Sequence, residues 1–131
     1  MSAKTNQPPR PTDAELEILT VLWSLGPSTV RDVHATIVRR KPAQYTTVLK
    51  TLQIMADKGL VKRNEKQRAH IYSAARPREW TQQQLAGDLL QRAFGGSAAS
   101  LMLGALAAHR ASPTELAELR KFLEEYEKGK P

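Results

Sequence analysis

Three short helical patterns followed at once by a basic hairpin pattern limit what this chain can fold into more than any other feature. They fill residues 12–75 of a chain of 131 residues. The first two helices are each predicted to begin at a capping box. There a threonine hydroxyl accepts a hydrogen bond from a free backbone amide, and an acidic side chain reaches back to the threonine amide. Thr12–Glu15 and Thr29–Asp32 have this pattern, so helices are expected to start directly after Thr12 and Thr29.

Apolar residues at intervals of three and four mark the buried faces of these two helices. The predicted faces are Leu16, Leu19, Leu22 and Trp23 in the first helix, and Val33 and Ile37 in the second. Gly26-Pro27 ends the first pattern. Arg39–Lys41 and Pro42 end the second, because cations suit a helix C-terminus and proline cannot continue a helix.

The third helix, predicted over residues 44–58, has two chemically different faces. Its apolar stripe, at positions i, i+4 and i+7, consists of Val48, Leu52 and Met55. At about 100° per residue, the opposite face is polar and almost free of acidic residues. This outer face includes Thr46, Lys50 and Gln53.

Residues 60–63 and 69–73 predict the two strands of a short β-hairpin, with a polar tip between them. Three helices followed by a basic hairpin is the order of a winged helix-turn-helix. In that fold the third helix enters the major groove of DNA and the hairpin lies along the flanking backbone.

The charge distribution also indicates a polyanionic partner for the first part of the chain. Residues 1–80 contain 14 lysines and arginines against 7 aspartates and glutamates, whereas residues 81–131 contain 6 of each. A basic part followed by a neutral, apolar part is expected when the first meets a polyanion and the second meets a protein surface.

Five side chains at and along the third helix are predicted to contact double-stranded DNA. Lys50 can reach a phosphate or the O6 and N7 of guanine, and Gln53 can pair with adenine. The methyl groups of Thr46 and Thr47 can meet a thymine methyl. Gln44 lies where the N-cap is expected and is a poor capping residue. Either its side chain is free to reach DNA or the helix starts elsewhere.

In the hairpin, the predicted phosphate contacts are the four cations Lys62, Arg63, Lys66 and Arg68. The alternatives are that these cations prevent an edge strand from pairing, and that the polar face of the third helix is simply solvated. The location beside a helix-turn-helix favours DNA. The three histidines show no metal-ligand spacing, and neither a metal nor a cofactor is predicted.

The remaining residues are predicted to form three helices that pair with a second copy of the chain. The middle segment, residues 98–108, is apolar nearly all round and must be covered on every side. A symmetric homodimer would cover it; the alternative is that it folds back on the winged domain of a monomer. The residues expected at the dimer interface are Leu101, Leu103, Gly104, Ala105, Leu116, Leu119 and Leu123. Small residues among them would let two helices approach closely.

The predicted fold class is therefore mainly α, in three parts. These are a flexible N-terminal arm (1–11), a winged helix-turn-helix DNA-binding domain (12–75) and a C-terminal three-helix dimerisation region (76–131). The arm has no apolar core of a secretory signal, and the longest apolar run is far below the ~20 residues that a membrane span requires. We therefore expect a cytoplasmic protein without a membrane-embedded part. The absence of cysteine excludes disulfides and thiolate metal sites.

Several short motifs occur in a characteristic order. They are Thr12–Trp23, Thr29-x-x-Asp32-Val33, Tyr45-Thr46-Thr47-Val48, Met55–Leu60, Arg68–Tyr72, and Phe94-Gly95-Gly96 followed by Ser100-Leu101. In this order the chain resembles the BlaI/MecI family of penicillinase repressors over residues 12–127. The resemblance implies a bacterial homodimeric repressor whose winged domain reads one half-site of a pseudo-palindromic operator. It implies a recognition role for Thr46, Thr47, Lys50 and Gln53, and a wing role for Lys66 and Arg68.

The resemblance is incomplete at the cleavage site through which some members of the family are inactivated. In β-lactam-responsive members, an Asn-Phe bond in the middle C-terminal helix is cut. The aligned positions here are Gly104 and Ala105. We therefore expect that a protease of different specificity, a ligand or a partner protein releases this repressor from DNA.

Two other functions are compatible with the pattern. One is a winged-helix module for protein–protein assembly, and the other is a MarR-like ligand-responsive regulator with a pocket between its domains. An enzyme is not expected, because the sequence has no glycine-rich phosphate loop, no nucleophile beside a base and no carboxylate pair in an apolar setting.

Overall fold

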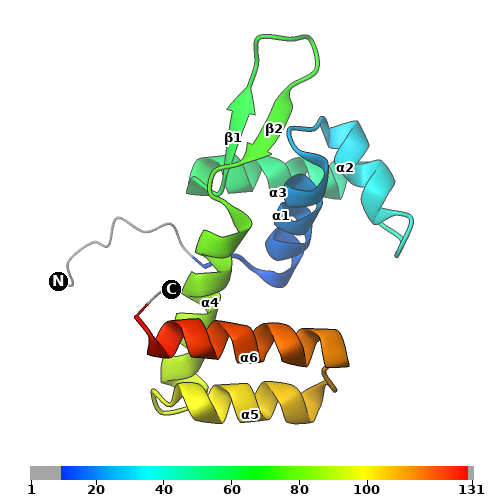
Figure 1. Ribbon diagram of the computed structural model, residues 1–131. Coiled ribbons are helices and arrows are strands. Elements are labelled where there is room, and N and C mark those ends of the chain that lie inside the picture. The colour runs from blue at the N-terminus through cyan, green and yellow to red at the C-terminus, as the bar shows by residue number, and fades with distance from the viewer. Residues whose placement is uncertain (1–9, 130–131) are drawn as a thin grey trace, which may run out of the picture. The chain divides into compact units, whose positions relative to one another are not determined.

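The computed structural model describes residues 10–129, and most of the arm expected at residues 1–11 lies outside this range. The described residues form six helices and one hairpin (Figure 1). Their bounds are α1 Asp13–Leu25, α2 Val30–Ile37, α3 Tyr45–Lys58, β1 Val61–Asn64, β2 Ile71–Ala74, α4 Arg78–Ala93, α5 Ala98–Ala108 and α6 Pro113–Glu127. The predicted fold class, mainly α with a winged helix-turn-helix, is confirmed.

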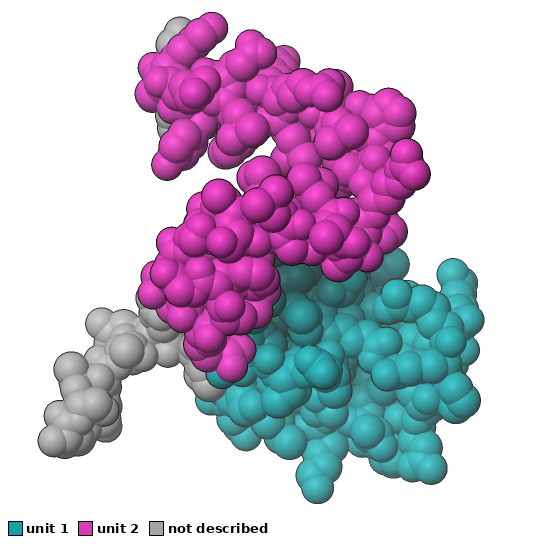
Figure 2. Space-filling model, turned by 90° about the horizontal axis from the view of Figure 1, so that it is seen from below, with its two compact units in different colours: residues 1–85 teal, residues 86–131 magenta. Residues whose placement is uncertain are grey.

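Two compact units divide the chain, one up to residue 85 and the other from residue 86 onward (Figure 2). We call them the winged unit and the helical unit. The division falls inside α4, later than the boundary expected at residue 75. The start of α4 and the residues just before it contact α1. Trp23 Nε1 donates to the carbonyl of Arg76, two residues before α4, at 3.0 Å, and the guanidinium of Arg78, the first residue of α4, lies over the Trp23 ring.

Both predicted capping boxes are present. The Thr12 hydroxyl accepts from the Glu15 amide at 3.2 Å, and the Glu15 carboxylate accepts from the Thr12 amide at 2.9 Å. Thr29 and Asp32 repeat this exchange at the start of α2. Both boxes satisfy amide groups that a helix start leaves unpaired, so α1 and α2 begin where the sequence predicts.

A single core joins α1, α2, α3 and the hairpin. It consists of Ile18, Leu19, Val21, Leu22, Val30, Val33, Ile37, Val48, Leu52, Met55, Leu60, Val61 and Tyr72. The inward faces predicted for α2 and α3 are correct, but the face predicted for α1 was partly wrong. Ile18 and Val21 are buried, whereas Leu16 and Trp23 are only half-buried. The reason is that α1 is contacted on more than one side, by α2, α3 and β2.

Besides capping α1, Glu15 forms an ion pair with Lys58. Its side chain is buried, and its carboxylate accepts from the Lys58 ammonium at 2.8 Å, which ties the start of α1 to the end of α3. Burial alone would raise the pKa of Glu15. The hydrogen bonds from Lys58 and from the Thr12 amide outweigh burial and hold that pKa below its ordinary value.

The wing is an antiparallel pair in which Val61 lies opposite Ala74 and Asn64 opposite Ile71. Backbone bonds also join β2 to the segment before α2. The Ser28 amide donates to the Tyr72 carbonyl at 2.9 Å, and the Tyr72 amide donates to the Ser28 carbonyl at 2.7 Å. These two bonds anchor the base of the wing beside the start of α2.

In the helical unit, α4 and α5 are joined by a tight turn at Gly95 and Gly96, whose φ angles of 56° and 82° favour glycine. The Gly96 amide donates to the Leu90 carbonyl at 3.0 Å and so helps to close α4. Ser112 is the N-cap residue of α6, where its hydroxyl accepts from the Glu115 amide at 3.1 Å, and a proline follows in the first turn. Pro77 lies one residue before α4.

Gly104 is exposed, and it also lies beside an aromatic ring of the same chain. A Cβ at this position would lie 3.2 Å from Cε1 of Phe94 in the same chain. The absent side chain therefore makes room for the Phe94 ring, which comes from the α4–α5 turn.

Among residues 10–129, no helix is both long and apolar enough to span a membrane.

Candidate nucleic-acid interface

Helix α3 separates its two faces as the periodicity predicts. Val48, Leu52 and Met55 are at most 4% exposed, whereas Thr46, Lys50 and Gln53 are exposed. Within the described part of the chain, the Lys50 ammonium has no ion-pair partner. This outer face is therefore available to an external ligand rich in acceptors and negative charge.

Gln44 is the N-cap residue of α3, and its side chain makes no capping hydrogen bond. Its carbonyl accepts from the amides of Thr47 and Val48, both at 3.1 Å. The helix therefore starts where the sequence predicts, and the exposed Gln44 side chain is free of a capping role. Of the two possibilities in the sequence, this is the one in which Gln44 can reach outward.

Thr47 lies about 60° around α3 from Lys50, toward α1. It lines a shallow depression of about 370 Å³ together with residues of α1 and of the α2–α3 turn, among them Ala14, Glu17 and Pro42. Its side chain is exposed, but it is at the edge of the outer face. Thr46, Lys50 and Gln53 form the centre of that face, and Thr47 and Gln44 extend it toward the helix start.

The start of α3 is held by His34, one of the three histidines without metal-ligand spacing. His34 Nε2 on α2 donates to the Ala43 carbonyl at 2.8 Å. The His34 ring also meets the Tyr45 ring edge-on, with centroids 5.7 Å apart. His34 therefore positions the first turn of α3 relative to α2, a role that its spacing in the sequence could not show.

The cations of the wing are not equivalent. Arg63 is held within the hairpin, because its Nε donates to Glu65 at 2.8 Å, and hydrogen bonding to Tyr72 and the nearby Glu65 charge raise its pKa. Lys66 and Arg68 are exposed, with no ion-pair partner among the described residues. Of these three wing cations, Lys66 and Arg68 are free to bind an external anion, whereas Arg63, also predicted to contact phosphate, is paired with Glu65.

Acidic residues mark the limits of the basic surface. On the far side of the α2–α3 turn, Glu17 pairs with Lys41 at 2.9 Å and with Arg40 at 3.7 Å. Asp57 is exposed near the C-terminal end of α3. Exposed cations without an ion-pair partner among the described residues include Lys50 on α3 and Lys66 and Arg68 in the hairpin tip.

Helices α2 and α3, the turn between them and the adjoining hairpin together define a winged helix-turn-helix protein. The sequence model described as penicillinase repressor matches residues 11–125. The chain belongs to the penicillinase repressor family, whose members are transcriptional repressors and not enzymes.

Relatives of known sequence agree with this membership. The transcriptional regulator BlaI of Mycobacterium tuberculosis, in two strains, is 34% identical over 118 residues, which is 89% of this chain and 85% of BlaI. A solution structure of the monomeric form of Bacillus licheniformis BlaI, in complex with the blaP half-operator, is 20% identical. That alignment covers 56% of this chain and 89% of the BlaI chain, with a TM-score of 0.49.

Proposed function

We propose that this protein is a cytoplasmic, sequence-specific transcriptional repressor that binds a pseudo-palindromic DNA operator as a homodimer. The observation that carries the proposal is the outer face of α3, where polar side chains are exposed directly opposite a fully buried stripe. Family membership and the net charge of +7 support a DNA partner. Repression would follow from steric occlusion of a promoter.

The proposed contacts divide into two kinds. Thr46, Lys50 and Gln53 lie where the third helix of a winged domain meets base edges, so they are assigned to sequence readout. Lys66 and Arg68 extend from the wing and are assigned to phosphate. Gln44 and Thr47 flank the helix start and complete the set.

The helical unit supports assembly with a second copy. Neither α5 nor α6 contains a buried residue, although α5 is composed almost entirely of apolar side chains. Leu103 is 69% exposed, Phe122 52% and Tyr126 65%. Leaving this much apolar surface in water is unfavourable, and an obligate homodimer interface would cover it.

The interface is assigned to α5 and α6, with Leu101, Leu103, Leu116, Leu119 and Leu123 as its apolar contacts. Gly104 and Ala105 are the small residues that would let the two copies approach closely. A two-fold dimer places two α3 helices on one duplex, so the operator should consist of two half-sites about one helical turn, or a multiple of it, apart.

For release from DNA, we propose a signal other than cleavage of an Asn-Phe bond. The corresponding positions, Gly104 and Ala105, lie inside α5. A protease of different specificity, a ligand or a partner protein would then be the inducer.

Lys50→Ala is expected to lower the preference for operator over mixed-sequence DNA, because it removes the longest donor from the outer face of α3. The cost is about 1–3 kcal/mol if Lys50 contacts a base. Fluorescence anisotropy on an operator found by in vitro selection, with mixed-sequence duplex as the comparison, measures this. Lys121→Ala on α6 is the matched control, and equal weakening on both duplexes would assign Lys50 to phosphate.

Arg68→Ala is expected to weaken binding to all duplexes alike and to flatten the salt dependence. Each phosphate contact contributes about 0.9 to the slope of log affinity against log salt. Titrations at several salt concentrations give that slope for wild type and variant. An unchanged slope would contradict the wing role.

A further inference from the structure

An open cleft lies between α2, the first turns of α3 and the base of the wing. Its volume is about 710 Å³. It is lined by Thr29, Val30, Arg31, His34, Tyr45, Leu49, Arg68, Ala69, His70 and Tyr72. These residues include two arginines and two histidines but no aspartate or glutamate.

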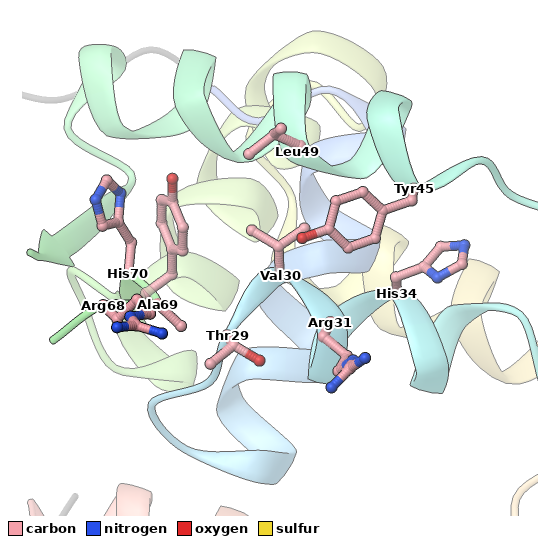
Figure 3. Close-up of a pocket in the computed structure, with 10 residues that line it drawn as sticks. Thr29, Val30, Arg31, His34, Tyr45, Leu49, Arg68, Ala69 and His70 are labelled. Carbon is pink, nitrogen blue, oxygen red and sulfur yellow. The ribbon is translucent and has the colours of Figure 1, made fainter.

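Two arginines from different elements lie at this cleft, Arg31 on α2 and Arg68 at the end of the hairpin tip. Figure 3 shows both guanidinium groups on the same side of the cleft, with Thr29 between them in this view. Both side chains are exposed, and neither has an ion-pair partner among the described residues. Guanidinium groups are well suited to hydrogen-bond phosphate oxygens in a fixed geometry.

Tyr45 supplies a third donor. Its side chain is 46% exposed, and its hydroxyl points into the cleft (Figure 3). The ring is held edge-on by His34, which is itself fixed to the Ala43 carbonyl. The hydroxyl is therefore presented from a positioned ring.

The cleft is anchored at its base. The paired backbone bonds between Ser28 and Tyr72 hold β2 next to the start of α2. The segment that carries Arg31 and the segment that carries Arg68 are thus joined only a few residues from each arginine, which limits how far the two sides can separate.

We propose that this cleft holds one phosphodiester of a DNA strand, gripped by Arg31 and Arg68 together and hydrogen-bonded by the Tyr45 hydroxyl. The proposal rests on the proposed function, since it takes DNA as the ligand. It adds Arg31 and Tyr45 as DNA-positioning residues on the wing side of α3. Because phosphate contacts are independent of sequence, Arg31, Arg68 and Tyr45 should contribute to binding of any duplex.

The test uses the full-length protein and a short mixed-sequence DNA duplex, so that no operator is needed. Arg31→Gln is expected to reduce the salt slope by about 0.9, and Lys121→Gln on the opposite side of α6 from Leu116, Leu119 and Leu123, with the same change of charge, should leave it unchanged. Tyr45→Phe should weaken binding while the salt slope is retained. Arg31 and Tyr45 are exposed or half-exposed, and thermal unfolding of each variant verifies the fold.

A double-mutant cycle asks whether the two arginines share one phosphate. If they do, the loss of affinity in Arg31→Gln/Arg68→Gln should fall short of the product of the single losses by about threefold or more. If the loss of affinity in the double variant equals the product of the two single losses, the arginines do not share one phosphate. If the salt slope of Arg31→Gln equals that of the wild type, the cleft is not a phosphate site. Failure of the proposed function is distinguishable, because wild-type protein would then bind no duplex even at low salt.

Discussion

Leu103→Asp is expected to convert the protein from dimers to monomers and to reduce operator affinity by about a hundredfold or more, because the two half-sites are no longer bound as one unit. Leu103 is the most exposed large apolar side chain of the described chain, so an aspartate there costs the isolated chain little. In a dimer interface, the same carboxylate would be buried without a partner, which is strongly unfavourable.

Light scattering coupled to size exclusion measures the oligomeric state, and anisotropy on the selected operator measures affinity. Ala117→Asp is the matched control, since it introduces the same charge at an exposed position of α6. Position 117 lies across that helix from Leu116, Leu119 and Leu123. A Leu103→Asp protein that remains dimeric would rule out α5 as the dimer interface.

Lys58→Met is expected to lower the free energy of unfolding by about 2–4 kcal/mol, because it leaves the buried Glu15 carboxylate without its cation. Lys58 is 32% exposed in its side chain, so solvent moderates the cost. Removing both charges, in Glu15→Gln/Lys58→Met, should recover part of the loss, since a neutral pair has no unpaired buried charge. Urea denaturation at neutral pH measures all three proteins.

The same pair gives a signed dependence on pH. The pKa of Glu15 is lower in the folded protein than its ordinary value of 4.5, so in acid the unfolded chain binds more protons than the folded one. The stabilisation is therefore complete above pH 4.5 and is lost as the pH falls through the lower folded pKa.

Glu15→Gln should flatten the stability profile in that acidic range. Glu17→Gln is the control, because Glu17 pairs with the exposed Arg40 and Lys41 at the surface, where such pairs contribute about 0–1 kcal/mol. If the Glu15→Gln and wild-type profiles were parallel below pH 4.5, the ion pair would not be the source of acid sensitivity.

The starts and ends of the helices in the winged unit could be predicted from sequence because they depend on local chemistry. The threonine capping boxes place the starts of α1 and α2. Gly59, at φ 82°, ends α3 because a left-handed residue closes the helix. The outer face of α3 was also predictable, since helical periodicity alone sets Lys50 opposite Leu52 and its buried neighbours.

The candidate site was predicted only in part. The sequence pattern predicts that Lys50, Gln53, Lys66 and Arg68 are exposed. It does not predict that Arg31 and His34 of α2 line the same surface. Arg31, His34 and Tyr45 come together with the wing only because the chain folds back on itself. Of these three residues, only Tyr45 belongs to a motif noted in the sequence, Tyr45-Thr46-Thr47-Val48. That motif does not indicate that Tyr45 faces a cleft.

The sequence by itself determined where elements begin and end, which faces of α2 and α3 are apolar, and where positive charge is concentrated. These properties arise from residues within a few positions of one another. Only the tertiary structure decided that Glu15 pairs with Lys58, that Ser28 anchors the wing through Tyr72, and that Phe94 fills the space beside Gly104. Contacts between residues distant in the chain depend on how whole helices and strands pack, and the local spacing of apolar residues does not determine that packing.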